Sequence, residues 1–433
     1  MKVQRVEKHI ITKRSKDYSL LDSICFDSKN LYNYTTYILR QAFTGNHKAI
    51  EEFKDLIVKD RFISEYELST RLSKLNQIDY RTLKAQVAQQ TIKLVYRNFK
   101  SFYKAIKAYK ECPSKFTGRP KLPNYKDKSK GRFIAVYTNQ CAKIKDGQIY
   151  LSKTIKLNIK SKIENFQQIR IVHKGYYIVV EIVYEKQVDD IVGIDLRENC
   201  MGIDLGVNNL ATITSDNGMS LIINGRNLKS INQYYNKKLA KIKLAYSKKN
   251  IYTGFAAQKL TLKRNNLILD YMHKASKYIT LIAKQNNIKY CFVGLNKQWK
   301  QECKMSKKNN QNFIQIPFNT FINLLKYKLE EYNIHLITLN ESHTSKCSFL
   351  DNEKICHHDK YIGRRIKRGL FKSGTGKVIN ADINGSLNIL RRGLGNSFKV
   401  NKSFFNPKII KDIEKNLVNL QDNKLEVMCF NHQ

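Results

Sequence analysis

The order of short apolar segments after residue 200 constrains the fold more than any other feature of the chain. Three predicted strands form an antiparallel meander, with a turn at Asp216-Asn217-Gly218 before the third; they span residues 201–205, 210–214 and 219–223. Helical and strand patterns then alternate, with helices at about 227–249, 256–287, 317–332 and from Asp382, and strands at 289–294 and 334–339. This is the element order of the ribonuclease H-like fold, so we expect an α/β domain here.

The first third of the chain is predicted to be helical, over residues 19–43, 50–75 and 80–111. The last of these stretches has an apolar stripe of Val95, Phe99, Phe102 and Ile106 and a basic stripe of Lys93, Arg97, Lys100 and Lys104. The two stripes are offset by two residues, about 200° around a helix. One face can pack and the other can contact phosphates. A merely solvated face would mix charges of both signs, which this one does not.

A basic, proline-containing connector follows the helical region. Pro113, Pro120 and Pro123 interrupt it, and it carries Arg119 and Lys121. Strand patterns at 150–159 and 169–184, with a turn at Lys174-Gly175, then predict a β-rich module over residues 131–188. We expect a small β-barrel there. At the other end of the chain, residues 396–433 are polar and are expected to be only partly ordered.

The net charge points to a polyanionic partner. Lys and Arg number 78 against 36 Asp and Glu, which gives a formal charge of +42 and a pI near 9.8. Codon bias in an AT-rich genome would also enrich Lys. It would enrich Glu as well, however, and Glu is not as abundant as Lys in this chain. The excess therefore indicates nucleic acid.

The chain is expected to be a soluble, cytoplasmic, nucleoid-associated protein. No apolar run approaches the ~18 residues of a membrane span, and the start, Met1-Lys2-Val3-Gln4-Arg5, is not followed by a secretory signal. The nine cysteines include no Cys-x-x-Cys pair, which is typical of reduced thiols rather than a disulfide framework.

Two carboxylates stand in settings that a metal-dependent nuclease would need. Asp204 lies within a predicted buried strand, and Asp382 lies where the last helix begins. Phosphodiester hydrolysis by two divalent ions requires three or more carboxylates from separate elements. Asp204 could instead bond a backbone amide at a strand end, but we interpret Gly202 and Gly206 as room for a bulky ligand. Asp195 repeats the local pattern without a following hairpin and is interpreted as a connector residue.

Several motifs resemble TnpB, the RNA-guided endonuclease of insertion sequences and a relative of the type V CRISPR effectors. They are MGIDLGVNNLATI at 201–213, FIQIPFNTFINLLKY at 313–327, ESHTSKCSFL at 341–350 and NADINGSLNILR at 380–391, with SKNLYNY at 28–34 and the segment 113–125 nearer the start. The resemblance covers about residues 1–395. It implies an α/β multidomain protein with a ribonuclease H-like (RuvC) nuclease domain and an N-terminal wedge β-barrel into which a helical recognition domain is inserted.

The resemblance also implies domain boundaries. These are residues 1–14 and 126–190 for the wedge barrel, 15–125 for the recognition domain, 191–340 and 379–396 for the nuclease domain, 341–378 for a nucleic-acid-binding insertion and 397–433 for a C-terminal tail.

The family's catalytic acids are Asp, Glu and Asp, and by resemblance the first and last are Asp204 and Asp382. The usual Glu ends the strand after the long helices, where this chain reads Phe-Val-Gly-Leu-Asn at 292–296 and has no carboxylate. Glu302 lies in a basic loop. Glu341 ends the next strand and is our candidate for a displaced catalytic Glu and metal ligand, with a salt bridge to Lys346 as the alternative interpretation.

A zinc site is not expected. Cys347 and Cys356, followed by His357 and His358, lack the usual ligand spacing. The basic segment after them carries Arg364, Arg365, Lys367 and Arg368 and is expected to contact phosphates. Trp299, flanked by lysines, is a candidate for stacking on a base, although a core position suits it equally.

The leading hypothesis is an RNA-guided DNA endonuclease that uses Mg²⁺, as two ions, held by Asp204, Glu341 and Asp382. Its partners would be a non-coding guide RNA and double-stranded target DNA, in a monomeric ribonucleoprotein without membrane contact. Two alternatives stay open. One is an RNA-guided DNA-binding repressor that has lost cleavage, and the other is a DNA transposase proper.

Overall fold

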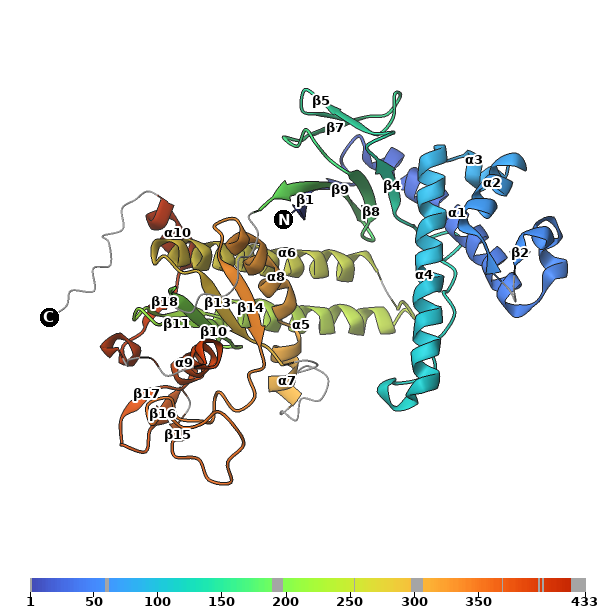
Figure 1. Cartoon of the computed structure of the whole chain (residues 1–433). Helices are drawn as coiled ribbons and strands as arrows, with labels where there is room; N and C mark the ends of the chain where they lie inside the picture. The colour runs from blue at the N-terminus through green and yellow to red at the C-terminus, as the bar shows by residue number, and fades with distance from the viewer. Residues whose placement is uncertain are drawn as a thin grey trace. The chain divides into compact units, whose positions relative to one another are not determined.

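The structure is a computed structural model that describes residues 2–58, 62–188, 198–252, 254–296, 307–367, 369–395, 398 and 401–421. The chain divides into two compact units, Met1–Gln187 and Val188–Gln433 (Figure 1). Each unit has its own hydrophobic core. No described helix combines the length and the apolar character needed to cross a membrane.

Two long helices form the framework of the first unit. α1 (Tyr18–Thr44) ends at Gly45, whose φ of 77° provides a left-handed C-cap, and α4 (Ala85–Glu111) packs against α1. The elements between them are η1 (His47–Leu56), the paired strands β2 (Ile57–Val58) and β3 (Phe62–Ile63), α2 (Glu65–Lys74) and α3 (Ile78–Arg81). The single helix predicted over 50–75 is therefore wrong, because a 3-10 helix and two short strands precede α2.

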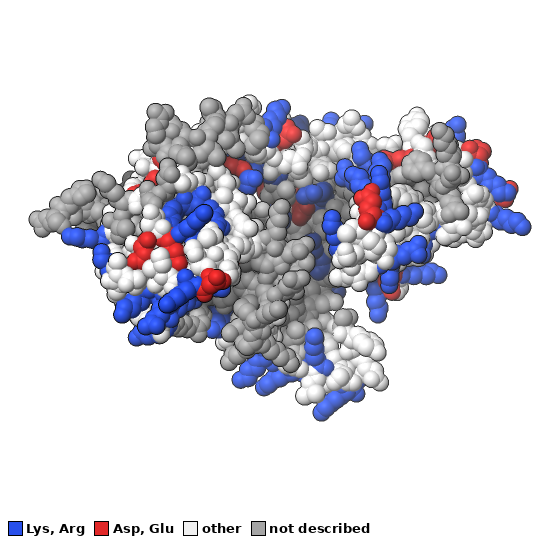
Figure 2. Space-filling model, turned by 60° about the horizontal axis from the view of Figure 1, so that its bottom comes forward, with Lys and Arg blue, Asp and Glu red and all other residues white. Residues whose placement is uncertain are grey.

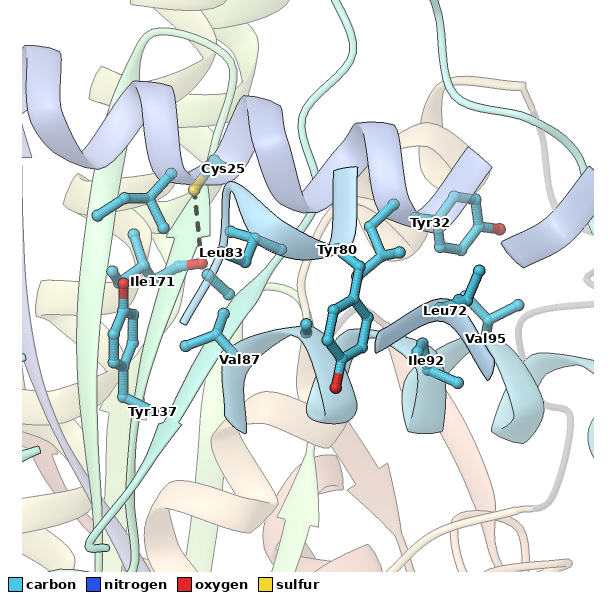
Figure 3. Close-up of a cluster of buried hydrophobic side chains, with 14 of the residues drawn as sticks. Cys25, Tyr32, Leu72, Tyr80, Leu83, Val87, Ile92, Val95, Tyr137 and Ile171 are labelled. Atoms are coloured by element: carbon cyan, nitrogen blue, oxygen red, sulfur yellow. Dashed lines mark hydrogen bonds between the residues drawn. The ribbon is translucent and has the colours of Figure 1, made fainter. Parts of the chain in front are cut away.

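Figure 3 shows how the helices and the sheet share one core. Leu72, Tyr80 and Val95 converge from three different helices and are all buried. Beside them the Cys25 thiol donates a hydrogen bond to the carbonyl of Ile171, at 3.7 Å from sulfur to oxygen. This contact joins α1 to β8 (Gln168–His173).

Besides the β2–β3 pair, the described strands of the first unit form two hydrogen-bonded sheets. β1 (Lys2–Thr12) pairs antiparallel with β9 (Tyr177–Gln187) along its whole length. The larger sheet has the order β1-β9-β8-β4, with β4 at Ala135–Thr138. The smaller sheet contains β5 (Lys143–Lys145), β6 (Gln148–Tyr150) and β7 (Lys156–Lys160). The predicted turn between β8 and β9 is confirmed, with Gly175 at φ 89°. Closure of the two sheets into a barrel stays a prediction.

Side chains of α1 hold the connector that follows α4 and its short turn η2 (Pro113–Lys115). Asn33 both accepts from the N–H of Lys126 at 2.8 Å and donates to its carbonyl at 2.9 Å. Arg40 donates to the carbonyl of Pro123 at 2.9 Å. The connector backbone is thus fixed, whereas the side chains of Arg119 and Lys121 are exposed.

The second unit is built on a six-stranded sheet with the order β14-β13-β10-β11-β12-β18. Its strands are β10 (Cys200–Leu205), β11 (Asn209–Ser215), β12 (Ser220–Asn224), β13 (Tyr290–Gly294), β14 (His335–Leu339) and β18 (Lys408–Ile410). The first three form an antiparallel meander, and β13 and β14 add to it in parallel. The predicted meander, and the alternation of helices and strands after it, are confirmed.

Alternate residues of the central strand face different helices. Met201 and Ile203 pack in the core made with α6 (Phe255–Gln285) and α8 (Phe318–Glu330). Cys200 instead packs with Ile389 and Leu390 of α9 (Ala381–Leu394). Because side chains alternate along a strand, Asp204 lies on the α9 face. The remaining helices are α5 (Arg226–Ser247), α7 (Lys307–Ile314), η3 (Lys402–Phe405) and α10 (Ile413–Gln421).

Part of the predicted C-terminal tail belongs to the sheet. β18 pairs in parallel with β12, and α10 packs against α6. β18 has three residues and α10 has nine, and both elements are too short and too polar in pattern to be predicted from the sequence. Helix α7 was also not predicted.

A small antiparallel sheet fills the segment between β14 and α9, formed by β15 (Arg364–Lys367), β16 (Leu370–Lys372) and β17 (Val378–Asn380). Two carboxylates fasten the loops around it. Glu353, 4% exposed, accepts from the N–H groups of Ser348 at 2.6 Å and Ile362 at 2.9 Å. Asp351 accepts from the N–H of Gly374 at 2.7 Å. These bonds replace secondary structure as the source of order in the loops.

Candidate active site

Asp204 lies near the end of β10, against the first turns of α9. A Cβ atom placed on Gly385 would stand 2.8 Å from Asp204 Oδ2. Asp204 is half-buried. Burial, and then the negative charges of Asp382 and Glu341, hold the pKa of Asp204 well above its usual range, while Arg365 acts in the opposite direction. A carboxylate in such a setting requires a cation to stabilise its ionised form.

Asp382 is placed by the start of α9. Asn380 caps the helix, because its side-chain oxygen accepts from the N–H groups of Asp382 at 2.9 Å and Ile383 at 3.3 Å. The Asn209 side chain donates to Asp382 Oδ2 at 2.7 Å. Arg365, from β15, stands 3.8 Å from Asp382 Oδ1. The carboxylate is thus oriented from two sides and is 33% exposed.

Glu341 follows β14 by two residues and is held by Asn296, which follows β13 by two residues. Its N–H donates to Asn296 Oδ1 at 3.1 Å, and its Oε1 accepts from Asn296 Nδ2 at 3.3 Å. Burial raises the pKa of Glu341 to about 7. The alternative pairing with Lys346 is not found among the described residues, where the Lys346 ammonium lies 5.7 Å from the centroid of the Tyr361 ring.

Gly294 explains how Glu341 reaches this position. It is the last residue of β13, on the same face as Phe292 and therefore facing α9. A Cβ atom there would stand 2.9 Å from Glu341 Oε2 and 2.6 Å from Ile389 Cδ1. The carboxyl group of Glu341 therefore occupies the space that a side chain at the end of β13 would enter.

Two amides of α9 join the helix to the segment that begins with Glu341. Asn384 accepts from the N–H of Phe349 at 3.0 Å and donates to the carbonyl of Cys347 at 2.9 Å. Asn388 donates to the carbonyl of Thr344 at 2.8 Å. Both amides are fully buried. Because α9 also carries Asp382, these bonds place Glu341 and Asp382 in one rigid frame.

The three carboxylates come together at one end of the sheet, but not as ligands around a single point. Asp204 interacts electrostatically with both of the others. Among the residues that the structure describes, no three His, Cys, Asp or Glu side chains gather closely enough to hold one ion. The donor set suits divalent cations that prefer oxygen.

The role that we predicted for Gly202 is wrong. A Cβ atom there would stand 2.6 Å from the carbonyl oxygen of Ser386 and 2.8 Å from Leu390 Cβ. The glycine makes room for α9 rather than for a ligand. Gly206 similarly makes room within the turn to β11, because a Cβ atom would lie 2.8 Å from the carbonyl oxygen of Asn209.

The cysteines and histidines of the insertion contact each other and the backbone. The Cys347 thiol donates to the carbonyl of Cys356 at 3.6 Å. Cys356 Sγ lies 3.3 Å from His358 Nε2. His357 and His343 pack ring against ring with centroids 5.8 Å apart.

The predicted nucleic-acid-binding cations lie on exposed surfaces. Lys93, Arg97, Lys100 and Lys104 are all exposed on α4, while Val95, Phe99 and Phe102 are buried on the opposite side, so the two predicted faces are confirmed. Arg364, Arg365 and Lys367 are exposed on β15. Trp299, Glu302, Asp195 and Arg368 lie outside the described residues. Figure 2 shows Lys and Arg over much more of the visible surface than Asp and Glu.

Asn209, Asn296 and the contact of Arg365 with Asp382 were not predicted as parts of the site. Asn209 and Asn296 lie at or just beyond the ends of the strands that border the site. A polar side chain at the end of such a strand is the only sequence feature that could have indicated these two residues. It can be recognised only once the order of the strands in the sheet is known.

Two family matches cover most of this unit. Residues 181–300 match the family described as "Probable transposase". Residues 318–389 match the one described as "Cas12f1-like, TNB domain". The first match includes Asp204 and the second includes Glu341 and Asp382, so the two matches together contain all three candidate acids.

One curated relative is also similar over part of the chain. The TnpB-like protein ORF457 of Acidianus two-tailed virus is 24% identical over 204 residues, which cover 45% of this chain and 41% of that protein. The match thus spans less than half of the relative's length. Together the matches show that the chain is TnpB-like.

Two solved structures cover most of the chain. A Cas12f1–sgRNA–target DNA complex is 16% identical, with 90% of this chain and 100% of that chain covered and a TM-score of 0.35. CasPhi-2 (Cas12j) bound to crRNA and phosphorothioate-DNA is 11% identical, with 92% of each chain covered and a TM-score of 0.41.

Proposed function

We propose that this chain is an RNA-guided, metal-dependent DNA endonuclease of a transposable element. The observation that carries the proposal is the meeting of Asp204, Glu341 and Asp382 at one end of the sheet, with burial and mutual repulsion raising the pKa of Asp204. Such a group of acids costs folding stability unless a cation binds it. In this proposal residues 191–340 and 379–396 form a RuvC-like nuclease domain.

The residues around the acids have separate roles in this proposal. Asp204 and Glu341 would hold one Mg²⁺ ion, and Asp204 and Asp382 a second. The ions would activate water and neutralise the phosphoryl group. Asn296 orients Glu341 and Asn209 orients Asp382, so that neither carboxylate must be ordered when substrate binds. Arg365 provides a positive charge beside Asp382 for a phosphate.

Guide RNA and target DNA would bind the positive surfaces. The exposed cations of α4, together with Arg119 and Lys121, would contact one nucleic acid backbone, and those of β15 another. Replacing Arg97 and Lys100 by Ala should make the fall of affinity with salt shallower without altering the fold. The matched control is Lys107→Ala with Lys110→Ala, two other exposed cations of α4.

The test is to express the chain with its neighbouring non-coding sequence. We expect one RNA species to copurify, and the complex to cut only DNA that matches the end of that RNA, with Mg²⁺. Cutting of any DNA by RNase-treated protein would indicate an ordinary nuclease. Guided binding without cleavage would favour the repressor, whose support was the missing Glu at the end of β13.

A pair of substitutions tests whether Glu341 replaces that Glu. Glu341→Ala should abolish cleavage and leave DNA binding intact. Adding Gly294→Glu to it should recover part of the activity, because the new side chain enters the space that Glu341 has left. Gly294→Glu alone should be inactive, since both carboxylates then compete for one space. Full activity of Glu341→Ala would remove Glu341 from the site.

A further inference from the structure

A cavity of about 460 Å³ has Asp382 in its lining, while Glu341 is not one of its lining residues. Its lining combines polar and charged groups of Asn208, Arg226 and Arg365 with the apolar side chains of Ile222 and Ile409. The volume is within the range of small-ligand sites, roughly 300 to 1,000 Å³. A cavity with cations on one side and aliphatic groups on another fits a nucleotide, which has an anionic phosphate and an apolar ring face.

The cations of this cavity continue along the start of α5. Arg226 and Lys229 lie in its first turns, and the first turn contains no acidic residue. A second hollow, lined by Asn208, Arg226 and Lys229, adjoins the cavity through the first two of these residues. In the part of the chain that the structure describes, neither cation pairs with a carboxylate. Cations at the start of a helix are unfavourable because they lie at the positive end of the helix dipole, and a bound anion would offset that cost.

The apolar side of the cavity comes from the C-terminal strand. Ile409 of β18 is 56% exposed, although its register partner Ile222 in β12 is only 2% exposed. An aliphatic side chain that stays exposed beside charged groups is available to pack against a sugar or base.

We propose that this cavity holds the nucleotide that adjoins the scissile phosphate of a single DNA strand, with Arg226 and Lys229 on its phosphate and Ile409 against its base. The proposal rests on the proposed function and adds a subsite to it. β18 and the start of α5 would thereby set the position of the cut relative to Asp382.

The test neutralises one phosphate at a time in the target strand. Methylphosphonate linkages are placed singly around the cut, and single-turnover rates are measured for the guided complex. With the wild-type chain, one linkage next to the cut should slow cleavage roughly tenfold or more, the loss expected for a charged hydrogen bond. Arg226→Ala should be slowed by a similar factor on unmodified DNA. On DNA that carries the methylphosphonate at that position, Arg226→Ala should cut no more slowly than the wild-type chain does, because both changes remove the same contact.

The matched control is Lys241→Ala, an exposed cation farther along α5. It should cut at the wild-type rate and remain sensitive to the same linkage. Losses that add at every linkage, or an Arg226→Ala rate equal to wild type, would overturn the subsite. If the wild-type chain does not cut unmodified matching DNA, the proposed function fails instead.

The apolar contact has its own measurement. Ile409→Ala should slow cleavage about fivefold on normal DNA, and the loss should disappear when the substrate is abasic at the nucleotide in the cavity. An unchanged rate with only a lower Tm would show that Ile409 serves the fold alone and would remove it from the subsite.

Discussion

Two regions of the second unit bury carboxylates in opposite ways. At the ends of β10 and β14, Asp204 and Glu341 lie where burial raises their pKa values. In the insertion, burial would also raise the pKa of Asp351, but hydrogen bonds from Ser348, Gly374 and Thr375 together lower it. Glu353 likewise receives two backbone N–H groups. These carboxylates of the insertion thus accept hydrogen bonds from backbone N–H groups of the insertion itself.

The difference separates a structural acid from an acid that requires a ligand. A carboxylate that accepts backbone hydrogen bonds stabilises the loop around it and needs no cation. Acids that are buried near each other, with a single amide partner for Glu341, destabilise the fold until a cation binds. Burying these acids near each other lowers the stability of the folded state, and a bound metal ion would restore that stability by neutralising their charge.

The largest expected effect is on cleavage. Asp204→Asn and Glu341→Gln should each slow guided cleavage by about 1000-fold, roughly 4 kcal/mol in transition-state stabilisation. The control is Asp216→Asn, because Asp216 is half-buried at the other end of β10 and accepts from the N–H of Cys200. Single-turnover rates measure all three. Equal losses in all three variants would erase the distinction between the two kinds of acid.

The next effect is on stability and belongs to the insertion. Glu353→Ala removes the acceptor of the buried N–H of Ser348 and of the part-buried N–H of Ile362, which should lower the free energy of unfolding by about 1 to 3 kcal/mol. Glu341→Ala in the metal-free protein should not. Amide hydrogen exchange at Ser348 and Ile362 provides a local readout, since both should exchange faster only in the Glu353 variant. Unchanged exchange would show that Glu353 does not fasten these loops.

A third effect depends on pH. The pKa of Glu341 in the folded chain, about 7, is above its ordinary value of 4.5. The folded state therefore favours the protonated acid, and metal-free stability should fall as pH rises from about 4.5 through 7, by at most about 3 kcal/mol. Mg²⁺ binds the ionised form, so it should raise Tm more at pH 8 than at pH 5. Glu341→Gln should lose much of that difference, and a Mg²⁺ effect independent of pH would contradict the assignment.

The smallest effect concerns orientation. Asn296→Ala removes the amide that holds Glu341, so the Mg²⁺ concentration for half-maximal cleavage should rise about tenfold, with recovery at high Mg²⁺. Asn199→Ala serves as the control, because Asn199 bonds the Asn286 carbonyl at the far end of β10. A lowered rate that excess Mg²⁺ does not restore would mean that Asn296 supports the fold rather than Glu341.

Local pattern was enough to predict much of the fold. The meander and the parallel strands show as apolar runs between turn residues, and the two faces of α4 show as stripes of helical period. The break before α2 and the elements β18 and α10 could not be predicted, because they are short and depend on contacts with distant segments. The three acids were found individually, from strand ends and from the resemblance.

The residues that surround the three acids could not be predicted from the sequence and are known only from the structure. In the sequence, residues 292–296 show only that the usual Glu is missing, whereas in the fold Gly294 provides the space that admits Glu341. Gly202 was interpreted as room for a ligand, but which neighbour approaches a glycine is decided by packing. Asn209 and Asn296 lie 173 and 45 residues from the acids that they hold. No periodicity links such pairs.

The most direct test of the central claim is a crystal structure of the guided complex with Mn²⁺, with the ions located by anomalous scattering. We expect manganese bound to Asp204, shared with Glu341 on one side and with Asp382 on the other. Manganese that does not contact Asp204, or a Glu341 carboxylate turned away to solvent while the ions are bound, would contradict the account.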